Sequence, residues 1–154
     1  MSDIVWAINP ARDRSADLIQ RMRHFAADLF TATDIEMQFT VESVFEGRPT
    51  DPELRRELLL IFKEAANNIV KHATAKQAGI RVWAKRGVFG FEVRDDGRGF
   101  DRAFLSGEGN GLPGIERRVR ALAGTCKITS SPGKGTQVWV EIPVGTRGRT
   151  YTKM

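Results

Sequence analysis

The chain is poor in cysteine and in long hydrophobic runs. Cys126 is the only cysteine among 154 residues, so no intrachain disulfide can form, and we expect a reducing compartment. The longest apolar runs, such as residues 58–62, are far shorter than the roughly 20 residues that a membrane-spanning helix needs. No basic-then-apolar signal segment opens the chain. We therefore expect a cytoplasmic chain that makes no membrane contact itself, although a longer parent protein could be membrane-anchored.

A strong charge of one sign is also lacking. Lys and Arg number 24 and Asp and Glu number 19, which leaves a formal net charge of +5. A solvated basic face explains so modest an excess better than a nucleic-acid surface does, so we expect no nucleic-acid partner. A nucleotide or an acidic protein would suit such a surface. The length and the 41% hydrophobic content are those of one soluble domain with a core of its own.

Hydrophobic periodicity predicts alternating helices and strands. Helices are expected over residues 2–9, 13–31, 51–75 and 113–123, and strands over residues 35–42, 79–85, 88–95, 125–131 and 136–143. Short turns between consecutive strands favour an antiparallel or mixed sheet. The helices would then cover one face of that sheet, which gives an α/β fold of the two-layer sandwich class. We assign residues 13–144 to this domain and residues 145–154 to a flexible tail.

The helix expected over residues 51–75 carries a row of polar side chains. Glu64, Asn68 and Lys71 are spaced by 4 and 3 residues, which places them on one side of the helix, and His72 follows. A magnesium ion bound to a triphosphate takes few protein ligands, so the amide oxygen of Asn68 would suffice. Glu64 could orient or deprotonate a nucleophile, and Lys71 could reach phosphate oxygens. A solvated helix edge remains the alternative for this row alone.

The segment Asp95-Asp96-Gly97-Arg98-Gly99 ends the strand expected over residues 88–95. Asp95 has the strand parity of its apolar neighbours, so its side chain should face the apolar layer, where a lone carboxylate is costly without a partner. The amino group of adenine would be a suitable partner, and Gly97 and Gly99 would leave room for a flat base. The alternative is a turn cap that binds nearby backbone amides.

Glycines surround the start of the helix expected over residues 113–123. They are Gly109, Gly111 and Gly114, with Leu112 between them. Free amides at a helix N-terminus favour phosphate, and the glycines would let the loop open and close. No strand runs directly into these glycines, which argues against a dinucleotide-binding fingerprint. Thr136 follows a second glycine-bearing turn and could offer its hydroxyl to a ligand.

Taken in this order, the four motifs resemble those of the GHKL ATPase superfamily, which includes gyrase, heat-shock chaperones, histidine kinases and mismatch-repair ATPases. Within it, the chain resembles the catalytic ATP-binding domain of bacterial sensor histidine kinases with a Glu-x-x-x-Asn N-box. The resemblance covers residues 2 to about 144 and implies the Bergerat ATP-binding fold. Residues 1–12 resemble the end of the dimerisation and phosphoacceptor helix and its junction.

The resemblance also implies roles for the motif residues and names ATP and Mg²⁺ as cofactors. Asn68 would bind magnesium, Glu64 would assist transfer, and Asp95 would read adenine. The remaining nucleotide contacts would come from Lys71 and His72 near the phosphates, Gly97 and Gly99 beside the base, Gly109, Gly111, Leu112 and Gly114 in the lid and phosphate turn, and Thr136 in the base pocket.

One feature of those kinases is missing, namely an acceptor histidine followed by an acidic residue. The chain has only His24 and His72, and neither lies in that context. We therefore expect a catalytic domain that passes the γ-phosphoryl group of Mg-ATP to a histidine on a separate dimerisation domain, in a parent homodimer with a downstream response regulator. The alternatives are a stand-alone anti-sigma-factor serine kinase of the same fold and a nucleotide-binding adaptor without catalysis.

Overall fold

The computed structural model describes residues 15–44, 51–85, 87–100 and 112–144. The predicted helix over residues 2–9, residues 101–111 before the last predicted helix, and the tail of residues 145–154 lie outside these ranges. Gly109 and Gly111 therefore lie outside the described residues as well.

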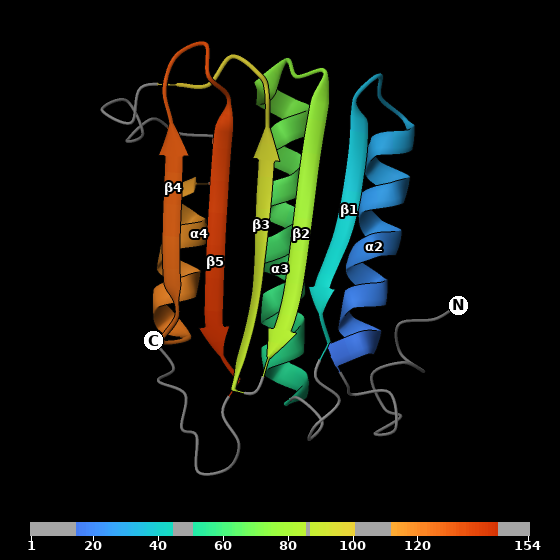
Figure 1. Cartoon of the computed structure of the whole chain (residues 1–154). Coiled ribbons are helices and arrows are strands. Elements are labelled where there is room, and N and C mark those ends of the chain that lie inside the picture. The colour runs from blue at the N-terminus through green and yellow to red at the C-terminus, as the bar shows by residue number, and fades with distance from the viewer. Residues whose placement is uncertain (1–14, 45–50, 86, 101–111, 145–154) are drawn as a thin grey trace.

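Five strands form one mixed sheet in the order β1-β2-β3-β5-β4 (Figure 1). The strands are β1 Glu36–Ser43, β2 Gln77–Lys85, β3 Val88–Asp95, β4 Thr125–Ser130 and β5 Thr136–Pro143. Strands β1 and β2 are parallel, because a long helix crosses over between them, and every other neighbouring pair is antiparallel. The expected mixed sheet is confirmed.

Three helices cover a single face of this sheet (Figure 1). They are α2 Ser15–Thr31, α3 Pro52–Asn68 and α4 Leu112–Ala121. The core lies between the two layers, and its centre is Phe62 of α3, whose ring meets Phe91 of β3 edge to face at 5.4 Å between centroids. The predicted two-layer α/β sandwich is therefore confirmed.

The long helix begins as predicted but ends differently. Asp51 occupies the N-cap position and Pro52 the first turn, although the Asp51 side chain makes no capping hydrogen bond. A regular helix to residue 75 was wrong in its last turn, because a π-helix, η2 Ile69–Ala73, follows α3 directly. Thr74 then ends the element with a left-handed backbone, at φ 54°. Such wide turns within helices are rare and frequently mark functional sites.

Helix α4 ends in a hydrogen-bonded turn in which Ala123, not a glycine, has the left-handed conformation, at φ 62°. The Gly124 amide donates to the Val119 carbonyl at 2.9 Å, which closes a Schellman motif with Gly124 one position beyond the left-handed residue. A Cβ on Gly124 would lie 2.7 Å from the Glu141 carbonyl oxygen of β5. Position 124 therefore requires glycine because β5 approaches it closely.

The sheet face that carries no helix in Figure 1 carries charged and aromatic side chains from neighbouring strands. Arg81 of β2 pairs with both Glu42 of β1 and Glu92 of β3, and Gln137 of β5 donates a hydrogen bond to Glu92. Glu92 is only 5% exposed, so its carboxylate depends on these partners. The pairs tie four neighbouring strands together across the sheet.

Candidate functional site

The predicted residues on the long helix lie at its C-terminal end, beside the end of β3. Helix η2 contacts β3, and the last turn of the long helix and the end of β3 both lie at the upper end of the molecule in Figure 1. Glu64 and Lys71 are exposed and Asn68 is half-buried. The side chain of His72 lies outside the described part of the structure.

Asn68 has a buried polar atom that a ligand could satisfy. Its Nδ2 atom is buried and has no hydrogen-bond partner among the described residues. An unsatisfied buried polar atom costs about 1–3 kcal/mol, so proteins rarely keep one without a reason. Rotation of the amide by 180° about χ2 would present its oxygen at the same place. The side chain can therefore serve a phosphate as a donor or a cation as a ligand.

Asp95 lies half-buried at the end of β3, where its Oδ1 accepts a hydrogen bond from the Gly97 amide at 2.7 Å. Burial raises the pKa of the Asp95 carboxyl above its usual value. The amides of Gly97 and Thr136 oppose this pKa shift by donating hydrogen bonds, whereas the neighbouring charge of Asp96 adds to it. The Asp95 side chain therefore does cap the turn, as the alternative considered above supposed. The same carboxylate is partly shielded from water, so a further hydrogen-bond donor would stabilise its charge.

Thr136 stands directly opposite Asp95, since the two residues are partners in the β3–β5 register. Strand parity directs both side chains to the helix-covered face, together with Val93 and Val138. Partners of this kind have Cβ atoms about 4.5–5.5 Å apart. The structure therefore brings together two residues that are 41 positions apart in sequence, both predicted to line the base pocket.

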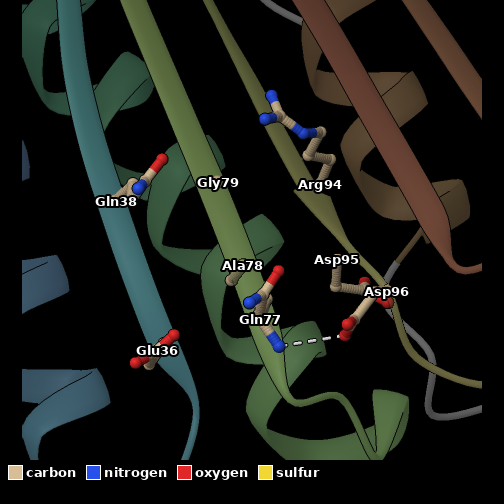
Figure 2. Close-up of a pocket in the computed structure, with 8 residues that line it drawn as sticks. All are labelled: Glu36, Gln38, Gln77, Ala78, Gly79, Arg94, Asp95 and Asp96. Atoms are coloured by element: carbon tan, nitrogen blue, oxygen red, sulfur yellow. Dashed lines mark hydrogen bonds between the residues drawn. The ribbon is translucent and has the colours of Figure 1, made fainter.

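Asp96 fixes the turn that carries Asp95. Its Oδ1 accepts hydrogen bonds from the amides of Lys76 and Gln77, each at 2.9 Å, and the bond to Gln77 is visible in Figure 2. These amides lower the pKa of the Asp96 carboxyl. The turn after β3 is thereby tied to the start of β2, which follows η2. Nothing in the sequence singles out Asp96, because Asp before Gly is ordinary turn composition.

Two glycines of the site have positive φ and lie against backbone. Gly135 has φ +76°, and a Cβ there would lie 2.1 Å from the Asp95 carbonyl oxygen. Gly99 has φ +64°, and its Cβ would lie 2.1 Å from the Ser131 carbonyl oxygen. The approach of the β4–β5 turn requires a glycine at position 99, and the predicted place of Gly99 beside the base stays a prediction. Gly97 is buried beside it.

Ser130, at the end of β4, was not among the predicted site residues. Its hydroxyl contacts the Phe100 amide at 2.9 Å, the Gly135 carbonyl at 2.9 Å and the Thr136 hydroxyl at 3.0 Å. It therefore joins the segment after the Asp95 turn to the start of β5. A serine near a strand end has no local sequence signature for such a role.

The start of α4 supplies the last described part of the site. Leu112 is buried in the core, and Gly114 lies half-exposed in the first turn. A Cβ on Gly114 would meet only Arg117, at 3.8 Å, so no crowding requires this glycine. Helix α4 packs against α3. An ion pair joins the two helices, with 3.8 Å between Nη1 of Arg118 and Oε1 of Glu57. Leu112 and Gly114 are thus placed on a helix beside α3.

A cavity of about 200 Å³ lies at the same end of the molecule on the helix-free face (Figure 2). Its lining includes Glu36 and Gln38 of β1, Gly79 of β2 and Arg94 of β3. The Arg94 guanidinium lies over Gly79, where an added Cβ would be 2.9 Å from its Cζ. Asp95 and Asp96 also line this cavity, so it adjoins the turn that carries the candidate site, although the sheet separates it from the side chains of Asn68 and Thr136.

The residues present fit a nucleotide that brings its own magnesium. Among the described residues, no group of three or more His, Cys, Asp or Glu side chains could hold a metal ion. A magnesium ion carried by a triphosphate needs only one or two protein ligands, and the orphaned Asn68 amide can supply one.

No helix in the described part of the chain is long and apolar enough to span a membrane.

Comparison with known proteins points to one family. The family described as "Histidine kinase-, DNA gyrase B-, and HSP90-like ATPase" matches residues 53–146. The signal transduction histidine-protein kinase/phosphatase DegS of Brevibacillus brevis is 26% identical over 129 residues, which cover 84% of this chain and 33% of DegS. The sensor histidine kinase YdfH of Bacillus subtilis is 38% identical over 87 residues, covering 54% of this chain and 21% of YdfH.

The chain therefore spans about a third or less of the length of these curated relatives. Among solved structures, the nucleotide-free catalytic domain of histidine kinase ThkA superposes with a TM-score of 0.65 at 15% identity, covering 85% of this chain and 94% of ThkA's. At that identity the superposition establishes a shared fold and no more.

Proposed function

We propose, from the premise that this chain belongs to the histidine kinase-, DNA gyrase B- and HSP90-like ATPase family, that it binds Mg-ATP as the catalytic domain of a two-component sensor histidine kinase. Its task is to pass the γ-phosphoryl group to a histidine on a separate helical domain of the same kinase. The observation that carries the proposal is the pairing of Asp95 with Thr136 at the same end of the fold as the orphaned Asn68 amide.

The base-binding half of the proposed site is formed by β3 and β5. The Asp95 carboxylate accepts a hydrogen bond from the adenine amino group, which replaces part of the solvation that burial removed. Thr136 contributes its hydroxyl from the opposite strand. Gly97 and Gly99 hold the turn in the shape that presents Asp95 to the base.

The phosphate-binding half is formed by the end of the long helix and the start of α4. Asn68 would ligate magnesium, and Lys71 and His72 would neutralise phosphate oxygens. The lid and phosphate turn come from Gly109, Gly111, Leu112 and Gly114, which precede and open α4. When bound, magnesium would withdraw charge from the β- and γ-phosphates and so favour transfer.

In phosphoryl transfer, the protein itself takes little covalent part in the reaction. The bond between the γ-phosphorus and its bridging oxygen breaks, ADP leaves, and one nitrogen of the acceptor imidazole forms the new bond to phosphorus. The proton on the other ring nitrogen must be stabilised or removed, and we assign this role to the Glu64 carboxylate, which is exposed. Most of the rate enhancement then comes from positioning and charge neutralisation.

The names of the matching relatives favour this function over the stand-alone anti-sigma-factor serine kinase, because the relatives are sensor histidine kinases. As partners we propose the phosphoacceptor domain of a homodimeric parent kinase and a response regulator downstream. A cytoplasmic location follows from the same proposal.

The first experiment measures binding of Mg-ATP and of ATP in EDTA by isothermal titration calorimetry. Wild-type protein should bind Mg-ATP, Asp95→Asn should lose at least about tenfold in affinity, and Asn68→Ala should lose the magnesium dependence. Asp28→Asn, on an exposed position of α2, is the matched control and should bind as wild type does. Absence of binding by wild-type protein at millimolar Mg-ATP would refute the proposed function.

The second experiment separates binding from transfer. Glu64→Gln should bind Mg-ATP normally and should slow phosphorylation of the acceptor domain supplied in trans by about 100-fold or more. An unchanged transfer rate would remove Glu64 from the mechanism and leave nucleotide binding intact.

A further inference from the structure

We propose that Ser130 is a positioning residue that fixes the Thr136 hydroxyl as a hydrogen-bond acceptor and thereby makes the site prefer adenine to guanine. This inference rests on the proposed function, because its ligand is a purine nucleotide. It concerns a residue that neither the motifs nor the family resemblance marks.

The inference follows from counting the protons around the Ser130 hydroxyl. A serine hydroxyl has one proton to donate and two lone pairs that accept. The Gly135 carbonyl, at 2.9 Å, can only accept, so the Ser130 proton goes to it. The Phe100 amide, at 2.9 Å, can only donate, so it takes one lone pair. The Thr136 hydroxyl, at 3.0 Å, must therefore donate its proton to the remaining lone pair of Ser130.

The Thr136 hydroxyl then has no proton left for a ligand. Its free lone pair and the Asp95 carboxylate form a pair of acceptors on facing positions of β3 and β5. An exocyclic amino group, as in adenine, offers two N–H donors to such a pair. The carbonyl at the same position of guanine offers only lone pairs and would face two acceptors without a donor.

Loss of the Ser130 hydroxyl would free the Thr136 proton. In Ser130→Ala, the Thr136 hydroxyl can rotate and donate to a carbonyl of the base, so GTP should gain a hydrogen bond that the wild-type site denies it. The ratio of dissociation constants for GTP and ATP should fall by about tenfold, the usual worth of one hydrogen bond. Ser130→Thr keeps the hydroxyl and should restore the wild-type ratio.

The experiment measures the affinities of Mg-ATP and Mg-GTP for each variant by calorimetry, together with thermal unfolding. Thr129→Ala is the matched control, because Thr129 precedes Ser130 on β4, is exposed and faces the other side of the sheet. It should leave the ratio unchanged. A residue with only a structural role would weaken both nucleotides equally, so an unchanged ratio in a folded Ser130→Ala protein would overturn the inference.

Thr136→Val keeps the inference testable even if Ser130→Ala does not fold. Removal of the Thr136 hydroxyl should by itself reduce the preference for ATP, and in that background Ser130→Thr and wild-type Ser130 should give equal ratios. A full preference for ATP in Thr136→Val would overturn the inference. Binding of neither nucleotide by wild-type protein would overturn the proposed function too, whereas equal binding of both by wild type would overturn only this inference.

Discussion

Two glycines of the β4–β5 turn offer a matched test of how the base-binding side is assembled. Gly133 and Gly135 both have positive φ, at +80° and +76°, so alanine suffers the same backbone strain at either position. An added Cβ meets nothing within 4 Å at Gly133 but lies 2.1 Å from the Asp95 carbonyl oxygen at Gly135. The difference between the two variants therefore isolates the close approach of the turn to Asp95.

The expected magnitudes follow from these distances. The left-handed backbone costs alanine about 1–2 kcal/mol, partly offset by about 0.4–1 kcal/mol of lost freedom in the unfolded chain, so Gly133→Ala should destabilise by about 1 kcal/mol. Real Cβ contacts essentially never fall below 3.0 Å, so in Gly135→Ala the start of β5 must move about 1 Å from Asp95. Overpacking of this kind adds about 1–3 kcal/mol.

Urea unfolding measures the stabilities, and calorimetric titration with Mg-ATP measures the affinity of each folded variant. Gly133→Ala should bind Mg-ATP as wild type does, whereas Gly135→Ala should bind about tenfold more weakly because Asp95 and Thr136 are displaced from each other. If both variants lost the same stability and bound Mg-ATP equally well, the proposed clash between a Cβ at position 135 and the Asp95 carbonyl oxygen would be refuted.

Two further predictions concern the core and the charge of Asp95. Phe62→Ala should destabilise by about 3–5 kcal/mol in urea unfolding, since the ring is fully buried against Phe91 and Phe25, and a loss below about 1 kcal/mol would contradict this packing. Because burial raises the pKa of Asp95, its stabilising contribution is present below the unfolded pKa of about 4 and is lost as pH rises through the folded pKa. Asp95→Asn should therefore unfold at a temperature equal to or above that of wild type at pH 7 and lose this advantage near pH 3, and a lower unfolding temperature confined to pH 7 would contradict that sign.

The sheet and its helices were largely predictable because their hydrophobic periodicity is regular. The apolar stripe of α3, which includes Leu54, Leu58 and Ile61, is buried as the helical spacing predicts. The parity of Asp95 and Thr136 likewise follows from alternation along β3 and β5, and it brings the two residues to the same face. Regular spacing was sufficient to predict these features.

The remaining features depend on contacts that local sequence does not encode. Nothing in the sequence of residues 69–73 distinguishes a π-helix from a regular turn, and η2 packs against β3, which is remote in sequence. The roles of Asp96 and Ser130 depend on hydrogen bonds to Lys76 and Phe100, residues 20 and 30 positions away. Both residue types are common in turns and at strand ends, so sequence alone could not assign them.

The most direct test of the central claim is a crystal structure of this chain with Mg²⁺ and a non-hydrolysable ATP analogue. The adenine amino group should lie within hydrogen-bond distance of the Asp95 carboxylate, and the metal ion should be coordinated by the Asn68 side chain, on the helix-covered side of the sheet. A nucleotide bound instead in the cavity beside Arg94 and Glu36, on the opposite face, would contradict the account.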